Sequence, residues 1–381
     1  MRLVLSLASL LIAVFSVATD VLPVPHDSGW CALGLCRSDQ MTASIDQEGM
    51  NSTNILTILD QDSGNPLLWS VYGELLAAQG KTEQAGAMYD HAVALGPHMA
   101  SVLMRAANFD FTHDRTDHGL SMANQILAQA DGFDEILFSY IASSRLPLEE
   151  VFDRVIPAED RPARSWLSWL RTSGSDHDLG ETFDWMMRHQ LADEESAVEL
   201  TKTLWGRHSY ALAQKVWVAW LGDRAGDYLK PDRIWNPTFE MPPTASPFDW
   251  VINPPPSVKV QRKNGLEIRF SGTDNLSFSH VQQFVTVAPG RYRFTAEIEA
   301  SGLTTDQHPL FRIQDAGRPA ALNMATEPIE TTRGRSTLRL DFTVPQGTSG
   351  LQIQLERRMS DRFDNKLAGT VHLYSVSLKP L

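Results

Sequence analysis

The spacing of apolar residues changes once along this chain of 381 residues, and that change constrains its fold more than any other feature. Over residues 65–228 apolar residues recur every three or four positions between short Gly, Pro and Asp stops, which is typical of helices. Beyond Lys230-Pro231 apolar and polar residues alternate, as in Leu266–Phe270 and Leu351–Leu355, which indicates half-buried strands. We therefore predict a multidomain protein, an all-α array followed by an all-β domain over residues 232–381.

The clearest helical segment covers residues 66–99 and predicts a pair of helices. Gly73 and Ala85 are small enough for the two helices to approach closely, and Tyr89 fills the space beside them. Pro97 ends the pair. One pair cannot bury its own apolar face, so we expect four or five stacked pairs along the array.

This pair resembles the tetratricopeptide repeat (TPR). The residues that carry the resemblance are Trp69, Tyr72, Gly73, Leu76, Gly80, Ala85, Tyr89, Ala92, Leu95 and Pro97. The resemblance implies a groove that binds protein partners. Ser70, Glu74 and Ala77 lie away from the packing positions and are the candidates for this groove, with an ordinary solvated helix face as the alternative.

The C-terminal segment predicts eight or so antiparallel strands in a two-sheet sandwich. Its motifs Trp235–Glu240, Val287–Tyr292 and Asp364–Thr370 resemble the galactose-binding-like jelly roll of carbohydrate-binding modules. The resemblance is closest to the copy fused to helical repeats in bacterial envelope proteins linked to exopolysaccharide or O-antigen clusters. It implies a jelly-roll fold and a glycan ligand.

Aromatic side chains are the best candidates for glycan contact, because the C–H face of a sugar stacks on a ring while its hydroxyls bind polar neighbours. Trp250 beside Asp249 has both features, and Trp235 precedes the first strand. Arg312 follows Phe311 and is a further candidate. The alternative for both tryptophans is packing in the core or between domains.

The same resemblance raises the question of a structural calcium ion. In the family an opening glutamate and paired acidic residues of the last strand can hold Ca²⁺. Here Glu240 is present, but Tyr374 and Ser375 occupy the matching strand positions. Glu240 alone provides too few hard oxygen ligands, so we predict no cofactor and leave Ca²⁺ as an open alternative.

The N-terminus predicts export from the cytoplasm to the periplasm or cell envelope. Residues 3–18 are apolar or small and uncharged, and Ser16-Val17-Ala18 fits a signal-peptide cleavage site. We interpret residues 1–18 as a signal peptide or an uncleaved anchor in the inner membrane. Residues 19–64 read as a linker, in which Cys31 and Cys36 are expected to form a small-loop disulfide or to remain free thiols.

Composition and motifs narrow the range of functions. The formal net charge is −13 and Lys and Arg form no stripe, which argues against nucleic-acid binding. The sequence has no metalloprotease, nucleophile-elbow or Walker motif, and the Ser, His and Asp of Ser173–Asp178 crowd into one segment that reads as a helix N-cap.

These observations favour a non-enzymatic exported scaffold that binds protein through its helices and glycan through its sandwich. Two alternatives remain open at this point: an enzyme of polysaccharide modification with an unrecognised site, and a structural interaction protein that binds no sugar.

Overall fold

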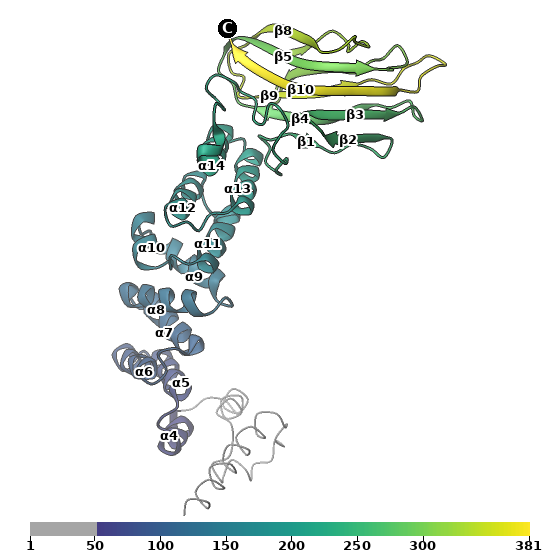
Figure 1. Ribbon diagram of the computed structural model, residues 1–381. Helices are drawn as coiled ribbons and strands as arrows, with labels where there is room; N and C mark the ends of the chain where they lie inside the picture. The colour runs from purple at the N-terminus through teal and green to yellow at the C-terminus, as the bar shows by residue number, and fades with distance from the viewer. Residues whose placement is uncertain (1–51) are drawn as a thin grey trace, which may run out of the picture. The chain divides into compact units, whose positions relative to one another are not determined.

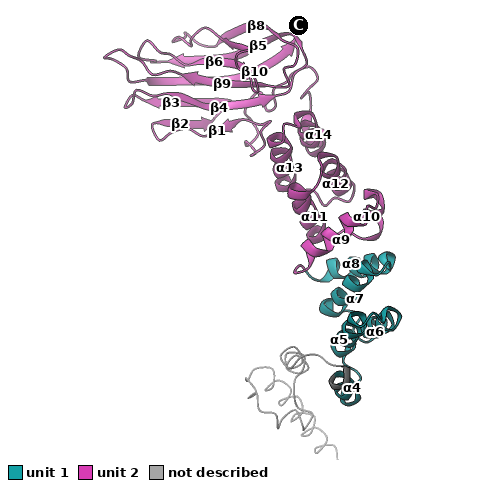
Figure 2. Ribbon diagram, turned by 180° about the vertical axis from the view of Figure 1, so that it is seen from behind, with its two compact units in different colours: residues 1–130 teal, residues 131–381 magenta. Residues whose placement is uncertain are grey.

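The computed structural model describes residues 52–381 (Figure 1). It confirms the fold class, because helices fill the N-terminal part of this range and two antiparallel sheets fill the C-terminal part. The chain divides into two compact units, residues 1–130 and 131–381, so the division falls within the helical array (Figure 2). The export segment and the cysteine pair lie outside the described residues. Within the described range, no helix combines the length and apolar character needed to cross a bilayer.

The first unit contains paired helices. Its first helix covers residues 52–61, within residues 19–64 that the sequence predicted to be a linker. The linker prediction is therefore wrong for this part. Ile55 and Leu59 are one helical turn apart and pack on Leu68 and Val71, so this short segment gains its helix from burial. The helices are α4 (Ser52–Gln61), α5 (Pro66–Ala78), α6 (Thr82–Leu95), α7 (Ala100–Thr112) and α8 (Thr116–Gln129).

Close contact between α5 and α6 depends on Gly73. A Cβ atom at this position would lie 3.1 Å from the ring of Tyr89, which is buried, so the prediction that a small residue admits Tyr89 is confirmed. Helix α5 starts where the sequence predicts it, since the Asn65 side chain accepts a hydrogen bond from the Leu67 N–H and Pro66 opens the first turn. Trp69 stays half-exposed and packs edge-on against His91.

The contact at Gly73 gives a first testable prediction. Gly73→Val forces the Tyr89 ring to move and should destabilise the protein by about 1–3 kcal/mol, as overpacking does. Gly206 is the matched control, because it also lies in a helix but a Cβ there would meet nothing within 4 Å. Gly206→Val should leave the melting temperature unchanged or slightly higher. Equal melting temperatures for the two variants in thermal circular dichroism would contradict the packing at Gly73.

The second unit continues the helical array before the sandwich begins. Ser175 and Asp193 each cap a helix through reciprocal hydrogen bonds with the residue three positions later. The Ser173–Asp178 segment is therefore a helix start, as predicted. The elements are α9 (Asp134–Ser143), α10 (Leu148–Arg154), α11 (Asp160–Ser173), α12 (Asp176–Arg188), α13 (Glu194–Gly206), α14 (Tyr210–Leu221) and the 3₁₀ turn η1 (Gly222–Ala225).

The sandwich consists of two five-stranded antiparallel sheets. We call sheet A the one with strand order β1-β4-β9-β6-β7 and sheet B the one with order β2-β3-β10-β5-β8. Sheet A contains β1 (Val251–Ile252), β4 (Phe278–Val285), β9 (Leu351–Arg357), β6 (Leu310–Asp315) and β7 (Asn323–Ala325). Sheet B contains β2 (Val258–Arg262), β3 (Leu266–Ser271), β10 (Ala368–Pro380), β5 (Gly290–Ser301) and β8 (Ser336–Val344).

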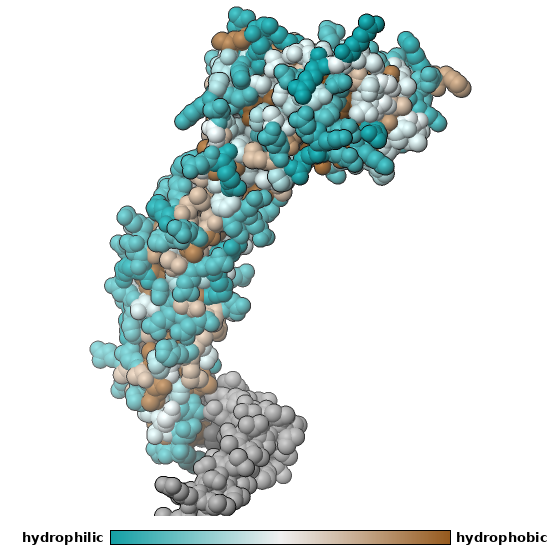
Figure 3. Space-filling model, viewed as in Figure 1, coloured by the Kyte–Doolittle hydropathy of each residue, from teal (hydrophilic) through white to brown (hydrophobic). Residues whose placement is uncertain are grey.

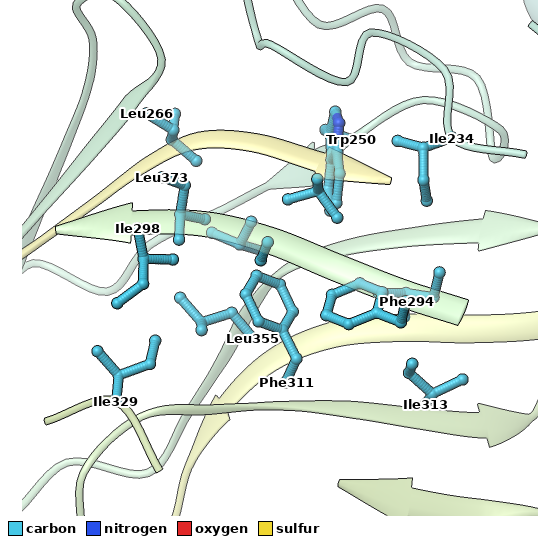
Figure 4. Packing of buried hydrophobic residues seen from close by; sticks show 14 of the residues in the cluster. Ile234, Trp250, Leu266, Phe294, Ile298, Phe311, Ile313, Ile329, Leu355 and Leu373 are labelled. Carbon is cyan, nitrogen blue, oxygen red and sulfur yellow. The ribbon is translucent and has the colours of Figure 1, made fainter. Parts of the chain in front are cut away.

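The core lies between the two sheets (Figure 4). Phe294 and Ile298 of sheet B face Phe311, Ile313 and Leu355 of sheet A. Successive side chains of a strand point to opposite faces, so residues that face the core alternate with residues that face outward. Hydrophilic residues cover much of the sandwich in the view of Figure 3. The core therefore decides which side chains are available for binding.

Arg357 lies at the end of β9 and holds three loops together. The side chain is 2% exposed, and burial lowers the pKa of its guanidinium while the Asp306 carboxylate opposes the shift. The guanidinium donates to the backbone carbonyls of Leu276, Gln307 and Asn365, the Asn275 amide oxygen and the Thr305 hydroxyl. These acceptors are uncharged and come from the β3–β4, β5–β6 and β9–β10 connections.

Removing this guanidinium should be costly. Arg357→Met leaves several buried oxygens without donors and should lower the free energy of unfolding by about 3 kcal/mol. Arg358→Met is the matched control, since the neighbouring side chain is largely exposed and should change stability by at most ~0.5 kcal/mol. Urea unfolding of both variants measures the difference, and equal midpoints would show that the loops do not depend on Arg357.

Candidate functional site

Trp250 lies in the core of the sandwich (Figure 4). Its side chain is 1% exposed, its ring packs on Phe239 with centroids 4.9 Å apart, and its Nε1 donates to the Asn236 carbonyl at 3.1 Å. A sugar cannot reach this ring while the core is closed. The structure therefore corrects the expected glycan contact at Trp250 in favour of the packing alternative.

Trp235 is also buried and packs between the helices and the sandwich. Its ring lies edge-on to Trp217 of α14 and to Tyr228, with centroids 6.5 and 5.6 Å apart. Its backbone exchanges two hydrogen bonds with the Gln283 side chain of β4, at 3.1 and 2.9 Å. Trp235 therefore joins the helices to the sandwich within the second unit. The prediction that it contacts glycan is wrong, and the packing alternative holds.

Asp249 is fully buried and shapes the turn before β1. One carboxylate oxygen accepts from the Thr244 N–H at 2.7 Å and its hydroxyl at 3.0 Å, and the other accepts from the Trp250 N–H at 2.7 Å. Burial raises the pKa of the Asp249 carboxyl, while these donors act in the opposite direction. Both carboxylate oxygens accept hydrogen bonds from the protein itself, so Asp249 stabilises this turn. The prediction that it contacts glycan is wrong.

Arg312 is the predicted glycan candidate that the structure leaves partly exposed, with 15% of its side chain accessible. It projects from the outer face of β6, between β9 and the edge strand β7 of sheet A. Its Nε donates to Glu356 Oε1 at 2.6 Å, and its Nη1 donates to Asn323 Oδ1 at 2.6 Å. The two acceptors come from the strands on either side, so the guanidinium is held in place across three strands.

Four glutamines lie beside Arg312. Gln282 of β4 is in register with Gln354 of β9, which is in register with Arg312. In the adjacent row Gln352 is in register with Gln314 of β6. Asn323 is exposed and the other residues of this surface are partly exposed. We call this surface the amide face: Gln282, Arg312, Gln314, Asn323, Gln352, Gln354 and Glu356.

Hydrogen bonds link the side chains of the amide face. Gln352 Nε2 donates to Gln282 Oε1 at 2.6 Å, and Gln354 Nε2 donates to Glu356 Oε2 at 3.0 Å. Each amide still has donor and acceptor capacity left, because a side-chain amide has two N–H donors and two acceptor lone pairs. The face can therefore bind a ligand that carries many hydroxyl groups, each of which donates and accepts.

Sequence reasoning did not select these glutamines. The alternating segment Leu351–Leu355 contains two of them, and alternation already predicts that they point away from the core. The missing information was which strands are neighbours, since Gln282 and Gln352 are 70 residues apart in the chain.

Of the three predicted groove residues of α5, one is buried and two are partly exposed. Ser70 is fully buried and its hydroxyl donates to the Leu67 carbonyl at 2.8 Å, which corrects its expected place in a groove. Glu74 is partly exposed and pairs with Arg105 of α7 at 2.5 Å, so it links two helices. Ala77 is partly exposed and remains a candidate.

Glu240 is exposed in the structure, and its backbone carbonyl accepts from Arg262. Across residues 52–381, no group of three or more His, Cys, Asp or Glu side chains lies close enough together to hold a metal ion.

Comparison with known proteins finds partial structural likeness. No family model matches the sequence, and no curated protein matches it. A solved CBM4 structure is 18% identical, with a TM-score of 0.29, over 39% of this chain and 99% of that one. TmCBM61 in complex with β-1,4-galactotriose is 16% identical, with a TM-score of 0.29 and the same coverage. YrrB, a TPR protein with an unusual peptide-binding site, is 13% identical, with a TM-score of 0.25, over 47% and 96%. At these values none of them assigns a ligand to this chain.

The position of Trp250 gives a third prediction. Trp250→Ala should lower the free energy of unfolding by about 3–5 kcal/mol, as large-to-small changes in a core do. Phe363→Ala is the control, because this ring is fully exposed and its loss should cost less than ~0.5 kcal/mol. If Trp250→Ala unfolds at the same denaturant concentration as the wild type, Trp250 does not stabilise the core and glycan contact is again the better interpretation.

Proposed function

We propose that this protein is a non-catalytic binding protein that holds a glycan on the amide face of sheet A. The observation that supports the proposal is the alignment of four glutamines with Arg312, Asn323 and Glu356 over neighbouring strands. Uncharged amides dominate the surface, so the proposed glycan is neutral and bound through its hydroxyl groups.

Binding of this kind is weak at each site. A hydrogen bond to a sugar hydroxyl replaces one to water, and its net contribution is only ~0.5–1.5 kcal/mol. A few such bonds give dissociation constants on the order of millimolar to micromolar. Repeated units along a polysaccharide would raise the overall affinity by multivalency.

Glu356 favours binding over catalysis. It is the one carboxylate among the residues of the amide face, and both of its oxygens are engaged, by Arg312 and by Gln354. Glycosidases of the common kind need two carboxylates on opposite sides of the scissile bond. An enzyme of polysaccharide modification is therefore the less supported alternative.

The remaining parts of the proposal concern partners and location. The helical array would bind a protein partner, with Glu74 and Ala77 as candidates on the partly exposed surface of α5. The apolar residues 3–18 support export to the periplasm or cell envelope, with cleavage or retention of an inner-membrane tether. We place the protein in cell-envelope or exopolysaccharide assembly, with a Cys31–Cys36 disulfide as a further prediction.

Affinity gel electrophoresis of the full chain tests the glycan proposal. The gels would contain hydroxyethylcellulose, β-1,4-galactan, galactomannan or xylan, and the wild-type protein should be retarded by at least one of them. The double variant Gln314→Ala/Gln354→Ala should bind that polysaccharide about tenfold more weakly, because two hydrogen bonds are lost.

Gln261→Ala is the matched control, because Gln261 is an exposed glutamine of β2 in sheet B. It should migrate as the wild type does in every gel. If no polysaccharide retards the wild type, or if the double variant is retarded as strongly, the amide face does not bind glycan and the structural interaction protein becomes the better interpretation.

A further inference from the structure

The amide face ends in a cluster of aromatic rings at the helical side of the second unit. Phe284 is in register with Gln352 and two residues from Gln282, so it projects from the same face of β4. Unlike the glutamines, it is only 6% exposed. The Tyr210 ring lies 5.0 Å from it and the Trp205 ring 5.8 Å from it, between centroids.

Trp205 is the exposed member of this cluster. Its ring is perpendicular to that of Phe284, an edge-to-face arrangement favoured between aromatic rings. The side chain is 37% exposed, the highest value among the tryptophans that the structure describes. Part of this aromatic surface therefore stays open to solvent, on a ring that packs against the strand neighbour of Gln352.

The loop between α13 and α14 fixes the positions of Trp205 and Tyr210. The Arg207 side chain donates to the carbonyls of Gly174 and Arg171 and pairs with Asp176 at 2.9 Å. The Trp205 ring also packs edge-on against Tyr210, with centroids 6.0 Å apart, and against Phe284, so part of its side-chain freedom is already lost before binding. Polar groups are also near, since the Tyr210 hydroxyl and His208 Nδ1 lie 2.8 Å apart.

We propose that Trp205 forms a sugar-stacking subsite at the helical end of the amide face. A glycan bound to the glutamines would extend toward α13 and place the C–H face of one pyranose ring on Trp205. The helical array thus completes the glycan site of the sandwich. This inference rests on the proposed function, because the same glycan must occupy the amide face.

The side-chain amides of the adjoining surface favour a sugar over an apolar protein segment at Trp205, because they can bind its hydroxyl groups. The Trp205 ring packs on Phe284, which is in register with Gln352 and two residues from Gln282 on β4. A protein helix or strand docking there would have to bury these amides, at a cost wherever they lack partners. A pyranose ring presents an apolar face to the tryptophan and hydroxyls to the amides.

The test is a length series of oligosaccharides. The probes are linear β-1,4-linked gluco-, galacto- and manno-oligosaccharides of two to six units, titrated into the full chain by isothermal calorimetry. Wild-type affinity should rise with length. Trp205→Ala should bind the hexasaccharide about 5–10-fold more weakly, equivalent to loss of one aromatic stacking contact, and should bind the disaccharide as the wild type does.

Two further substitutions separate stacking from packing. Trp205→Phe keeps a ring and should retain most of the affinity, whereas Trp205→Leu keeps apolar volume against Phe284 but should bind as weakly as Trp205→Ala. Trp69→Ala is the matched control, because Trp69 is a partly exposed helical tryptophan that packs edge-on against His91 in the first unit. It should leave every affinity unchanged.

The outcomes distinguish this inference from the function on which it rests. If Gln314→Ala/Gln354→Ala loses binding while Trp205→Ala and Trp205→Leu keep wild-type affinity at all lengths, the subsite is refuted and the amide face stands. If Trp205→Leu binds as well as Trp205→Phe, an aromatic ring is not required, and the sugar-stacking subsite is refuted. If the wild type binds no oligosaccharide and no polysaccharide, both proposals fail together.

Discussion

The closed apolar core between sheets A and B fixes which side chains of the sandwich can meet a ligand. Phe311, Ile313 and Leu355 must face inward to fill the space against sheet B, and the period of two along each strand then sends Arg312, Gln314 and Gln354 outward. A shift of one residue in register would bury these polar groups and expose the apolar ones. The same core that stabilises the fold therefore presents the amide face.

The helices depend on close packing to a larger degree than on surface charge. Gly73 lets Tyr89 enter between α5 and α6, and two reciprocal caps start α12 and α13 at defined residues. Ion pairs such as Arg171–Glu199, which joins α11 to α13, lie near the surface, where each contributes only ~0–1 kcal/mol. The end of α13 matters for the inferred sugar-stacking subsite, because Trp205 stands there.

Two tryptophans show how local sequence misleads about binding. Trp250 lies beside the acidic Asp249, which favoured it as a glycan contact, yet it is buried in the core. Trp205 lies in an amphipathic helix, where the sequence gives no reason to distinguish it from packing residues. The exposure of a side chain depends on which distant parts of the chain pack against it. The residues next to it in sequence do not show this.

The sequence by itself determined the local structure: a period near 3.6 before residue 228, a period of two after residue 232, the start of the Ser175 helix and the small residue at Gly73. These features follow from interactions between residues a few positions apart. Only the tertiary structure decided that Gln282 lies beside Gln352, 70 residues away, and that Arg312 meets Glu356, 44 residues away. Strand pairing is non-local, because the backbone hydrogen bonds that join strands are the same for every sequence, so the choice of neighbours is made by how the whole core packs.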